Sequence, residues 1–511
     1  MKNIVAKISK EQKIAFIGTW IVGVFCYFMM MSNRFLTYDS MWNLVSEQDI
    51  LYLGRQFLTY ACKISSDYDL PALNGLLSIF YLSVAAALLV DVFDIKSSVF
   101  AFLTGGMLVS FPSVINTFVY SFTVDGYMLA VLLITLAFFV TVKYKWGFIA
   151  GIFLCGFSIG IYQAYFSYLI MLCIVFILIK VLDESDWKKL AVIGGKFVAV
   201  GIGGYIFYIV TLKIMLSLKH VELSGYQGVS GMLNFQAGGL GTGIKTAFSD
   251  LWYFTRYGHV LSATADMKVA YFMILAVIVA IYVSLFIKNK RFKSPAHIVA
   301  AVLMIALIPV ALEIFVIMAP DVYFHLLMRY GWVVILIAVL PLGNRFANEF
   351  KEKKISKVSN IVIAIICAVM IFGFVRMANI VAFNMQERYE KNYALSLRIL
   401  DRLEQEEEYK TGDKVAILGG QLDAQRYPST VYTEDILAGF VGVNDDYFTM
   451  ETHYFATFYS HYMNVTIVPA ESYIEEELVN SNEFMEMEPF PSKECIRKID
   501  GVWVIKLTNT K

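Results

Sequence analysis

Six polar residues lie at the outer ends of apolar segments or in the outer segments between them, where they could bind or transfer a charged group. They are Asp39, Arg55, Asp125, Gln163, His325 and Arg329. A carboxylate can accept a proton from an attacking hydroxyl group, and an arginine can bind a phosphate through paired hydrogen bonds. Ionisable residues beside hydrocarbon persist where they line a cavity or serve a function. These residues therefore predict a polar cavity at the boundary between lipid and water.

Several of these residues also have a simpler structural interpretation. Asp125 stands where it could cap the helix that follows it, and Arg329 could extend its charged end from hydrocarbon into water. Glu313, late in an apolar segment, could line the cavity or form a structural ion pair. Tyr162 and Tyr165 fit the aromatic belts found at membrane surfaces. The sequence leaves these alternatives open.

The elements that must position these residues are long apolar segments. Hydrophobic residues make up 58% of the 511-residue chain and charged residues 16%, with a mean hydropathy of +0.63. A soluble protein of this length would not carry so many apolar residues. We therefore predict an α-helical polytopic membrane protein with about eleven spanning helices. Their expected ranges are 14–31, 73–92, 99–114, 124–142, 148–162, 165–182, 190–216, 269–287, 296–318, 327–342 and 358–380.

The positions of lysine and arginine predict the orientation of these helices. The first segment is long for a signal peptide and lacks a clear cleavage site, so we expect it to be retained. With the N-terminus in the cytoplasm, every basic cluster between segments falls on the cytoplasmic side. These clusters lie at 143–145, 180–189, 288–293 and 345–357. An odd number of spans then places the C-terminal part outside the cytoplasmic membrane.

The composition changes near residue 385. We predict a transmembrane domain at 1–384 and a small extracytoplasmic α/β domain at 385–511. Acidic residues outnumber basic ones about two to one in the second part. Its expected elements are a helix at 386–407 and strands at 415–418, 465–468 and 502–507.

Two outer segments are long enough to contain structure of their own. The segment 32–70 includes an amphipathic stretch at 40–64, and the segment 219–268 includes an expected amphipathic helix at 244–259. A glycine-rich run at 238–246 only partly matches a phosphate-binding loop, so we expect a flexible loop there. We expect no polar cluster on the inner face comparable to the outer one.

The remaining composition argues against several other functions. The net charge is zero, which indicates no nucleic-acid partner. The six cysteines are scattered without metal-site spacing, and His453 and His461 lack a third ligand at a recognisable distance in the sequence. We expect no cofactor, and the sequence leaves dependence on a divalent ion open.

Four short motifs together resemble the GtrII-like family of Gtr-type membrane glucosyltransferases. They are Asp39, the pair Gly54–Arg55, the aromatic turn Tyr120–Asp125 and the run Gly160–Ala164. The last of these, GIYQA, is the most specific. Relatives often carry two adjacent acids at the first position, where Ser40 follows Asp39 here. The resemblance covers about the first third of the chain and extends to the rest only in layout.

The resemblance implies a GT-C architecture with an active site on the outer face of the membrane. It implies inverting transfer of glucose or another hexose from a polyprenyl-phosphate donor to a surface glycan such as O-antigen, a wall polymer or a teichoic polymer. The stretch at 40–64 would lie beside the lipid, and the tail would help to recognise the acceptor. Further partners would be the bilayer, a donor synthase and a flippase. The implied site residues are Asp39 and Asp125 for catalysis, Arg55, Arg329 and His325 for the donor phosphate, and Gln163, Tyr162 and Tyr120 for the sugar.

Three other functions fit the same layout. A transporter or flippase for lipid-linked sugars would place ionisable groups near the membrane midplane, whereas here they gather at outer ends. A polysaccharide polymerase or ligase would change the chain length of a glycan instead of adding single residues. A noncatalytic assembly or sensor protein would use the acidic tail to bind a partner.

Overall fold

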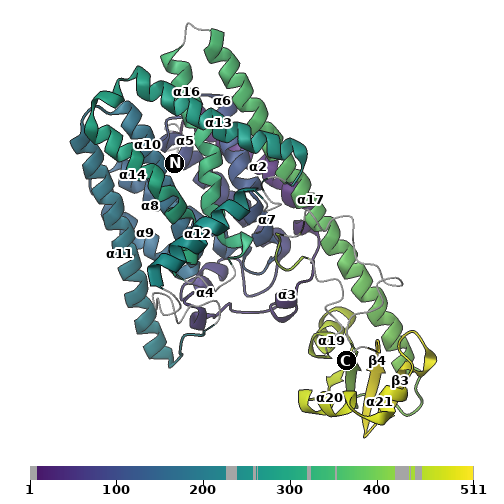
Figure 1. Cartoon of the computed structure of the whole chain (residues 1–511). Coiled ribbons are helices and arrows are strands. Elements are labelled where there is room, and N and C mark those ends of the chain that lie inside the picture. The colour runs from purple at the N-terminus through teal and green to yellow at the C-terminus, as the bar shows by residue number, and fades with distance from the viewer. Residues whose placement is uncertain are drawn as a thin grey trace. The chain divides into compact units, whose positions relative to one another are not determined.

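A computed structural model describes residues 8–225, 239–256, 261, 263–318, 324–350, 354–419, 437, 439–443 and 452–509. Contacts group the chain into two units, and Figure 1 shows the elements of both. The first unit comprises Met1–Asn33, Ser46–Asn379 and Gly439–Val441. The second comprises Arg34–Val45, Ile380–Ala438 and Gly442–Lys511.

The first unit is a bundle of apolar helices. Within the described ranges, nine helices are long and apolar enough to span a membrane. A further pair, α6 (Ser98–Ser110) and α7 (Pro112–Phe118), is bent by 46° and can form one broken span, and α9 (Gly147–Ile161) is a shorter apolar helix. The predicted polytopic helical fold is therefore confirmed. The nine helices are α2 (Lys10–Ser32), α5 (Pro71–Val92), α8 (Val124–Lys143), α10 (Phe166–Asp183), α11 (Trp187–Lys219), α13 (Ala265–Lys288), α14 (Pro295–Leu312), α16 (Val333–Glu349) and α17 (Lys354–Glu404).

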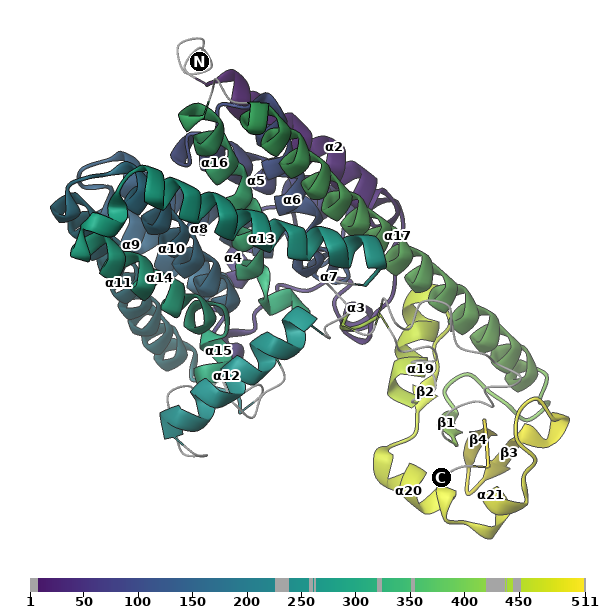
Figure 2. The same cartoon turned by 45° about the horizontal axis from the view of Figure 1, so that its top comes forward.

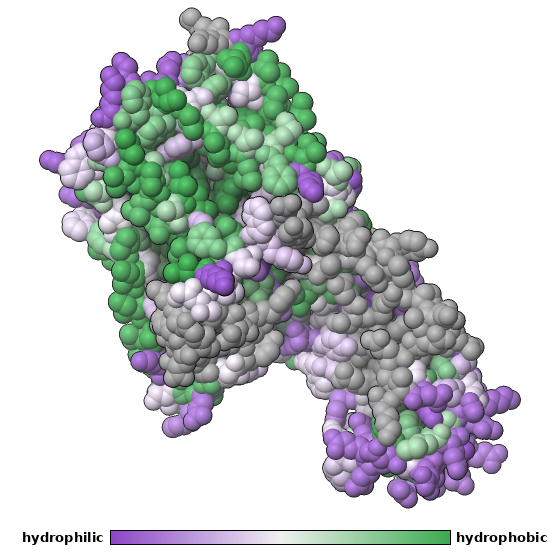
Figure 3. Space-filling model, in the orientation of Figure 1, coloured by the Kyte–Doolittle hydropathy of each residue, from purple (hydrophilic) through white to green (hydrophobic). Residues whose placement is uncertain are grey.

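The helices expose apolar side chains, as a surface in contact with lipid requires. Val198, Ile202 and Ile206 of α11 are 59%, 59% and 56% exposed. Their spacing of four residues places them on one face of that helix. In Figure 3, hydrophobic residues dominate the visible face of the helical unit, and hydrophilic residues dominate that of the C-terminal unit. Helices suit this environment because they satisfy their backbone hydrogen bonds internally where water is absent.

Small residues allow some of these helices to pack closely. A Cβ atom at Gly105 of α6 would lie 2.5 Å from the backbone oxygen of Ala15 and 2.4 Å from the hydroxyl oxygen of Thr19, both in α2. Close backbone approach through small residues is a common source of helix association in membranes. A larger side chain at this glycine would push the two helices apart.

The outer stretch 40–64, which we predicted to be amphipathic, consists of several short elements. It contains the end of α3 (Tyr38–Trp42), the 3-10 turn η1 (Leu51–Leu53) and α4 (Leu58–Cys62). Gly54 has a φ angle of +69° and ends the 3-10 turn. Glycine adopts this left-handed conformation at little cost, so the chain turns here instead of continuing as a helix.

The glycine-rich run near residue 240 is helical from Gly239 onward, although we predicted a flexible loop. It begins α12 (Gly239–Arg256), which contains most of the predicted amphipathic helix, while residues 257–259 lie outside the described ranges. A Cβ atom at Gly243 would lie 2.7 Å from the backbone oxygen of Ile317 in α15 (Ile314–Met318). The absence of a side chain at Gly243 thus lets α12 pack directly on α15.

The second unit contains a four-stranded sheet with strand order β2-β1-β4-β3. Strand β1 (Lys414–Leu418) pairs in parallel with β2 (Val468–Pro469) and β4 (Val502–Lys506), and β3 (Ile496–Ile499) pairs antiparallel with β4. All residues of β4 are buried, as expected for a central strand. The predicted C-terminal α/β fold is confirmed, but β3 was not predicted and most of 465–468 is not a strand.

The last spanning helix and the predicted helix of the tail are one element, α17, with 51 residues. The boundary predicted at residue 385 therefore falls inside a continuous helix. The segment 34–45, which the sequence analysis assigned to the transmembrane domain, also belongs to the second unit. Its Leu36 and Met41 join Phe455 and Phe458 in that unit's hydrophobic core. Other helices of this unit are α19 (Thr452–Phe458), α20 (Ser472–Val479) and α21 (Asn482–Glu486).

Candidate active site

Two motifs that are distant in the sequence meet at one end of the helical unit. The backbone N–H of Phe57 donates to the carbonyl oxygen of Gly160 at 2.8 Å. The side-chain Nε2 of Gln163 donates to the carbonyl oxygens of Leu53 and Gly54, each at 2.9 Å. These hydrogen bonds hold the backbone on both sides of Arg55, so the GIYQA run positions the Gly54–Arg55 pair.

Arg55 lies against two tyrosine rings. Its Nη1 donates to the hydroxyl oxygen of Tyr127 at 2.7 Å. Its Cζ lies 4.9 Å from the ring centre of Tyr162 and 5.8 Å from that of Tyr127. The two tyrosine rings are stacked, with centres 4.5 Å apart. Hydrogen bonding and cation–π contact therefore orient the guanidinium, but neither tyrosine neutralises its positive charge.

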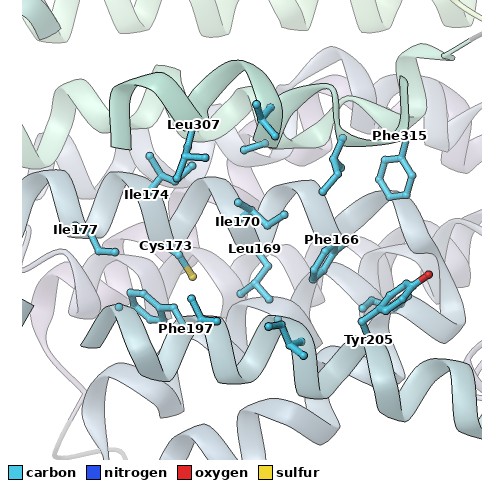
Figure 4. A pocket seen from close by; sticks show the side chains of 18 of the residues that line it. Phe166, Leu169, Ile170, Cys173, Ile174, Ile177, Phe197, Tyr205, Leu307 and Phe315 are labelled. Carbon is cyan, nitrogen blue, oxygen red and sulfur yellow. The ribbon is translucent and has the colours of Figure 1, made fainter. Parts of the chain in front are cut away.

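An apolar cavity of about 590 Å³ lies between α10, α11 and α14. Figure 4 shows aliphatic and aromatic side chains from these helices facing one another across it. From Phe166 to Ile177 on α10 the lining extends about 16 Å, at about 1.5 Å per residue. That length is about half of the hydrocarbon layer, which is about 30 Å thick. The exposed residues of α11, Val198, Ile202 and Ile206, also line the cavity, so it opens to the surface that faces lipid.

Residues that line the cavity contact the backbone that carries Arg55. Gln163 and Tyr208 both line it, and Gln163 donates to the hydroxyl oxygen of Tyr208 at 3.3 Å. A Cβ atom at Gly54 would lie 2.6 Å from that hydroxyl oxygen and 2.8 Å from Nε2 of Gln163. One end of an otherwise apolar cavity is therefore built from polar groups next to an arginine.

Arg329 belongs to a buried ion-pair cluster. Its Nη1 lies 2.6 Å from Oδ2 of Asp250 and 3.2 Å from Oε1 of Glu313, whose side chain is fully buried. Its Nη2 donates to the backbone oxygen of Phe324 at 3.1 Å. Of the two interpretations left open for Glu313, the geometry matches the structural ion pair. Arg329 thereby joins α12, the end of α14 and the turn before α16.

His325 and Arg329 lie outside the regular part of α16, although we predicted that the spanning segment begins at residue 327. They flank η5 (Leu326–Met328), and η6 (Tyr330–Trp332) then leads into α16. Burial, and then the positive charge of Arg329, lower the pKa of His325 below its ordinary value. His325 is therefore held in its neutral form at neutral pH.

The two arginine clusters are connected by tyrosine rings. The ring of Tyr165 lies edge-to-face against Tyr162, with centres 5.3 Å apart, and against Tyr330, with centres 5.9 Å apart. Tyr162 is only 3% exposed, so its ring serves the packing around Arg55. Tyr120, in the turn before α8, packs edge-to-face against Phe122.

Asp125 leaves α8 on a different face from Tyr127. Two residues along a helix are about 200° apart, so the two side chains point in nearly opposite directions. Asp125 is 1% exposed, and among the residues that the structure describes neither of its carboxylate oxygens has a partner in ordinary hydrogen-bond geometry. Burial, and then the nearby Asp125 carboxylate, raise the pKa of Cys62 in α4. Asp125 therefore faces α4, and it is not the N-cap residue of α8, which is Thr123.

Sequence reasoning missed Asp69, a second buried carboxylate that interacts electrostatically with Asp125. Asp69 is 7% exposed, and its Oδ2 accepts a hydrogen bond from the hydroxyl of Ser121 at 3.0 Å. The sequence offered only a weak signal, an acid two residues before the helix that begins at Pro71. Among the residues that the structure describes, no group of three or more His, Cys, Asp or Glu side chains is arranged to hold a metal ion.

Asp39 belongs to the second unit, whereas Arg55 and Asp125 belong to the first. It is an exposed residue of α3, and its backbone oxygen accepts a hydrogen bond from the side chain of Asn43 at 2.7 Å. Ser40 and Thr37 cap this helix reciprocally, each side chain accepting from the other's backbone N–H. The serine that stands in place of a second acid therefore has a structural function.

A second pocket, which is polar, lies at the end of the helices opposite Arg55, where we expected no polar cluster comparable to the outer one. Its volume is about 220 Å³, and it lies at the C-terminal ends of α5, α10 and α16. Nε of Arg345 lies 3.0 Å from Oδ2 of Asp183, and the side chain of Asn344 donates to the backbone oxygen of Asp94 at 3.2 Å. Helix C-termini leave carbonyl groups without intrahelical partners, so these residues fasten helix ends together.

A comparison with protein families agrees with the motifs that meet in this structure. The profile described as glucosyl transferase GtrII matches residues 28–336, more than half of the chain. The matched range contains Gly54–Arg55, the GIYQA run and all the residues that line the apolar cavity. No curated protein and no solved structure matches the chain. The chain therefore belongs to the GtrII family of membrane glucosyl transferases.

Proposed function

We propose that this protein transfers glucose or another hexose from a polyprenyl-phosphate donor to a cell-surface glycan, with inversion at the anomeric carbon. The observation that carries the proposal is the junction between the apolar cavity and the Gly54–Arg55 pair. Such a donor has one long apolar chain and one anionic head group. The cavity can hold the apolar chain, and the arginine can bind the anionic head group.

In this proposal the prenyl chain enters the cavity from the lipid beside α11. Arg55 binds the donor phosphate, and Tyr127 and Tyr162 hold its guanidinium in place beforehand. Arg329 is balanced by Asp250 and Glu313, so we assign it a positioning function. The phosphate-binding functions predicted for Arg329 and His325 stay predictions.

In the transfer step an acceptor hydroxyl oxygen bonds to the anomeric carbon while the bond from that carbon to the phosphate oxygen breaks. The leaving polyprenyl phosphate takes the bonding electron pair, and Arg55 stabilises its charge. A carboxylate takes the hydroxyl proton, and we propose Asp39 or Asp125 as this base. Gln163, Tyr162 and Tyr120 are the proposed sugar-binding residues.

We place the active site on the outer face of the cytoplasmic membrane, with the N-terminus in the cytoplasm. Lys143, which pairs with Asp91 at 2.9 Å, and Arg345 lie at the end of the helices opposite Arg55. Basic residues of membrane proteins concentrate on the cytoplasmic side. A donor synthase and a flippase would then supply the site, the second unit would help to recognise the acceptor, and the acceptor would be O-antigen, a wall polymer or a teichoic polymer.

The substitution Gly201→Leu tests whether the cavity holds the donor lipid. Gly201 lines the cavity, and a Cβ atom there would meet only the ring of Phe166, at 3.7 and 3.9 Å, so a leucine side chain would extend into the cavity. We expect the KM for a long-chain polyprenyl-phosphate glucose to rise about tenfold, because losing about 1.4 kcal/mol of apolar contact changes affinity tenfold. The KM for a donor with one or two isoprene units should change little.

The matched control is Gly195→Leu on the same helix. In the described part of the chain no atom lies within 4 Å of a Cβ placed at Gly195, and this residue does not line the cavity. An equal KM for both variants with the long-chain donor would contradict the cavity assignment. Mass analysis of the modified glycan provides the second readout, since altered chain length without single-residue addition would indicate a polymerase or ligase.

A further inference from the structure

Helix α12 is held on the first unit by one of its faces. Gly243, Ala247 and Phe254 are buried, and Gly243 packs on the backbone of Ile317 in α15. Asp250 pairs with Arg329 at 2.6 Å. Contacts at both apolar and charged positions therefore fix which side of α12 faces the protein.

The face that α12 exposes is divided into an apolar stripe and a polar stripe. Ile244, Phe248 and Trp252 are 38%, 49% and 59% exposed. Their spacing of four residues aligns them along the helix. Lys245, Ser249 and Tyr253, each one position further, are exposed and form a parallel stripe in which every side chain carries a polar group. Three large apolar side chains would be costly to keep in water, so this pattern calls for an apolar contact along one edge only.

The position of α12 in the chain places it at the membrane surface. It stands between the spanning helices α11 and α13 in the sequence, and it crosses the direction of α11 in both views (Figures 1 and 2). Through Arg329 it is joined to Glu313, which directly precedes the cavity-lining residues Ile314 and Phe315. The helix is thus anchored at the polar end of the apolar cavity.

We propose that α12 is a membrane-interface helix whose stripe of Ile244, Phe248 and Trp252 inserts among the lipids. Lys245 and Ser249 then face water at the level of the head groups. The helix is tied to spanning segments on both sides in sequence, and tryptophan favours the boundary between head groups and acyl chains. The lipid surface is therefore the partner that matches a narrow apolar edge beside a polar one.

This assignment adds a property to the proposed donor site. The rim of the cavity would lie at the depth where the phosphate of a membrane lipid sits, so a lipid-linked donor could enter by lateral movement. That consequence rests on the proposed function. The interfacial position of α12 rests only on the exposure, spacing and contacts of its residues.

Four single-cysteine additions to the full chain in lipid bilayers test the proposal. The six native cysteines are buried, so an added surface cysteine can be labelled selectively with an environment-sensitive fluorophore. Phe248→Cys and Trp252→Cys report on the apolar stripe, and Lys245→Cys and Ser249→Cys are controls on the same helix. We expect nitroxide-bearing lipids to quench the first pair at least about threefold more than the controls, and aqueous iodide to show the reverse order.

Equal quenching at all four positions, or stronger iodide quenching at Phe248→Cys, would overturn the proposal. Should Trp252→Cys fail to fold, the comparison of Phe248→Cys with its neighbour Ser249→Cys still tests whether the apolar stripe lies among the lipids. Glucosyl transfer by the unmodified protein is measured separately. Loss of the proposed transfer activity with the expected quenching pattern would contradict the proposed function and leave the interfacial helix in place.

Discussion

Arg55 and Arg329 are joined by the same tyrosine packing, but different groups hold them. Arg329 contacts two carboxylates, a backbone carbonyl and two phenylalanine rings. Arg55 donates to a tyrosine hydroxyl and lies against two tyrosine rings. The charge of Arg329 is thus balanced by two carboxylates, whereas two tyrosines orient the guanidinium of Arg55. The comparison shows that the function of an arginine near an apolar boundary follows from the groups that it contacts and not from its position in the sequence.

The largest expected effect is on stability, in Arg329→Met. This change leaves Glu313 buried without its cation, and breaking such a buried pair costs about 3–5 kcal/mol. The free energy of unfolding in detergent or bicelles, measured by denaturant titration, should fall by that amount. The double variant Arg329→Met with Glu313→Gln should recover part of the loss. Unchanged stability of Arg329→Met would remove the distinction between the two arginines.

The next effect is on activity, in Arg55→Gln. A hydrogen bond to a charged group contributes about 1.5–3 kcal/mol, so kcat/KM for polyprenyl-phosphate glucose should fall about 10- to 100-fold. The thermal midpoint should remain close to that of the wild type. Arg55→Lys retains the charge and should be less impaired. If Arg55→Gln instead unfolds as readily as Arg329→Met, both arginines are structural.

A smaller effect is expected from Gln163→Leu. The carbonyl oxygens of Leu53 and Gly54 would lose their donor, at a cost of about 1–3 kcal/mol. Because this backbone carries Arg55, the KM for the donor should rise more than kcat falls. Steady-state kinetics at varied donor concentration separate the two constants. A loss confined to kcat would place Gln163 in the chemical step and not in the positioning of Arg55.

The smallest effect concerns pH and the cluster of Arg329. An unfolded histidine takes up a proton below about pH 6.5, whereas burial and Arg329 lower the pKa of folded His325. Protonation therefore favours the unfolded state, and the stability present at pH 7 to 8 should decline as the pH falls below 6.5. His325→Gln should reduce this slope by less than about 1.4 kcal/mol per pH unit. Parallel pH profiles of the two proteins would show that His325 does not contribute.

The agreement between sequence and structure differs from element to element. The apolar segments were predictable because their lengths follow from the thickness of the bilayer. The short elements within the stretch 40–64 were not predictable, since its amphipathic pattern does not show that Gly54 ends a 3-10 turn in the left-handed conformation. Strand β3 escaped because two of its four residues are not buried, which leaves a short apolar signal. Asp69 escaped because an acid beside a helix start is common, and only burial distinguishes it.

The spanning segments and the α/β fold of the tail could be predicted from the residues alone. Those properties depend on local hydrophobicity and on the spacing of apolar residues, and both can be read directly from the sequence. The folded arrangement was needed to show that Arg55 lies against tyrosine rings and that Arg329 is paired with Asp250 and Glu313. It was also needed to show that Asp39 belongs to the same unit as the tail. The partners of a charged group come from residues far apart in the chain. The free-energy cost of burying the charge depends on which of these groups pairs with it.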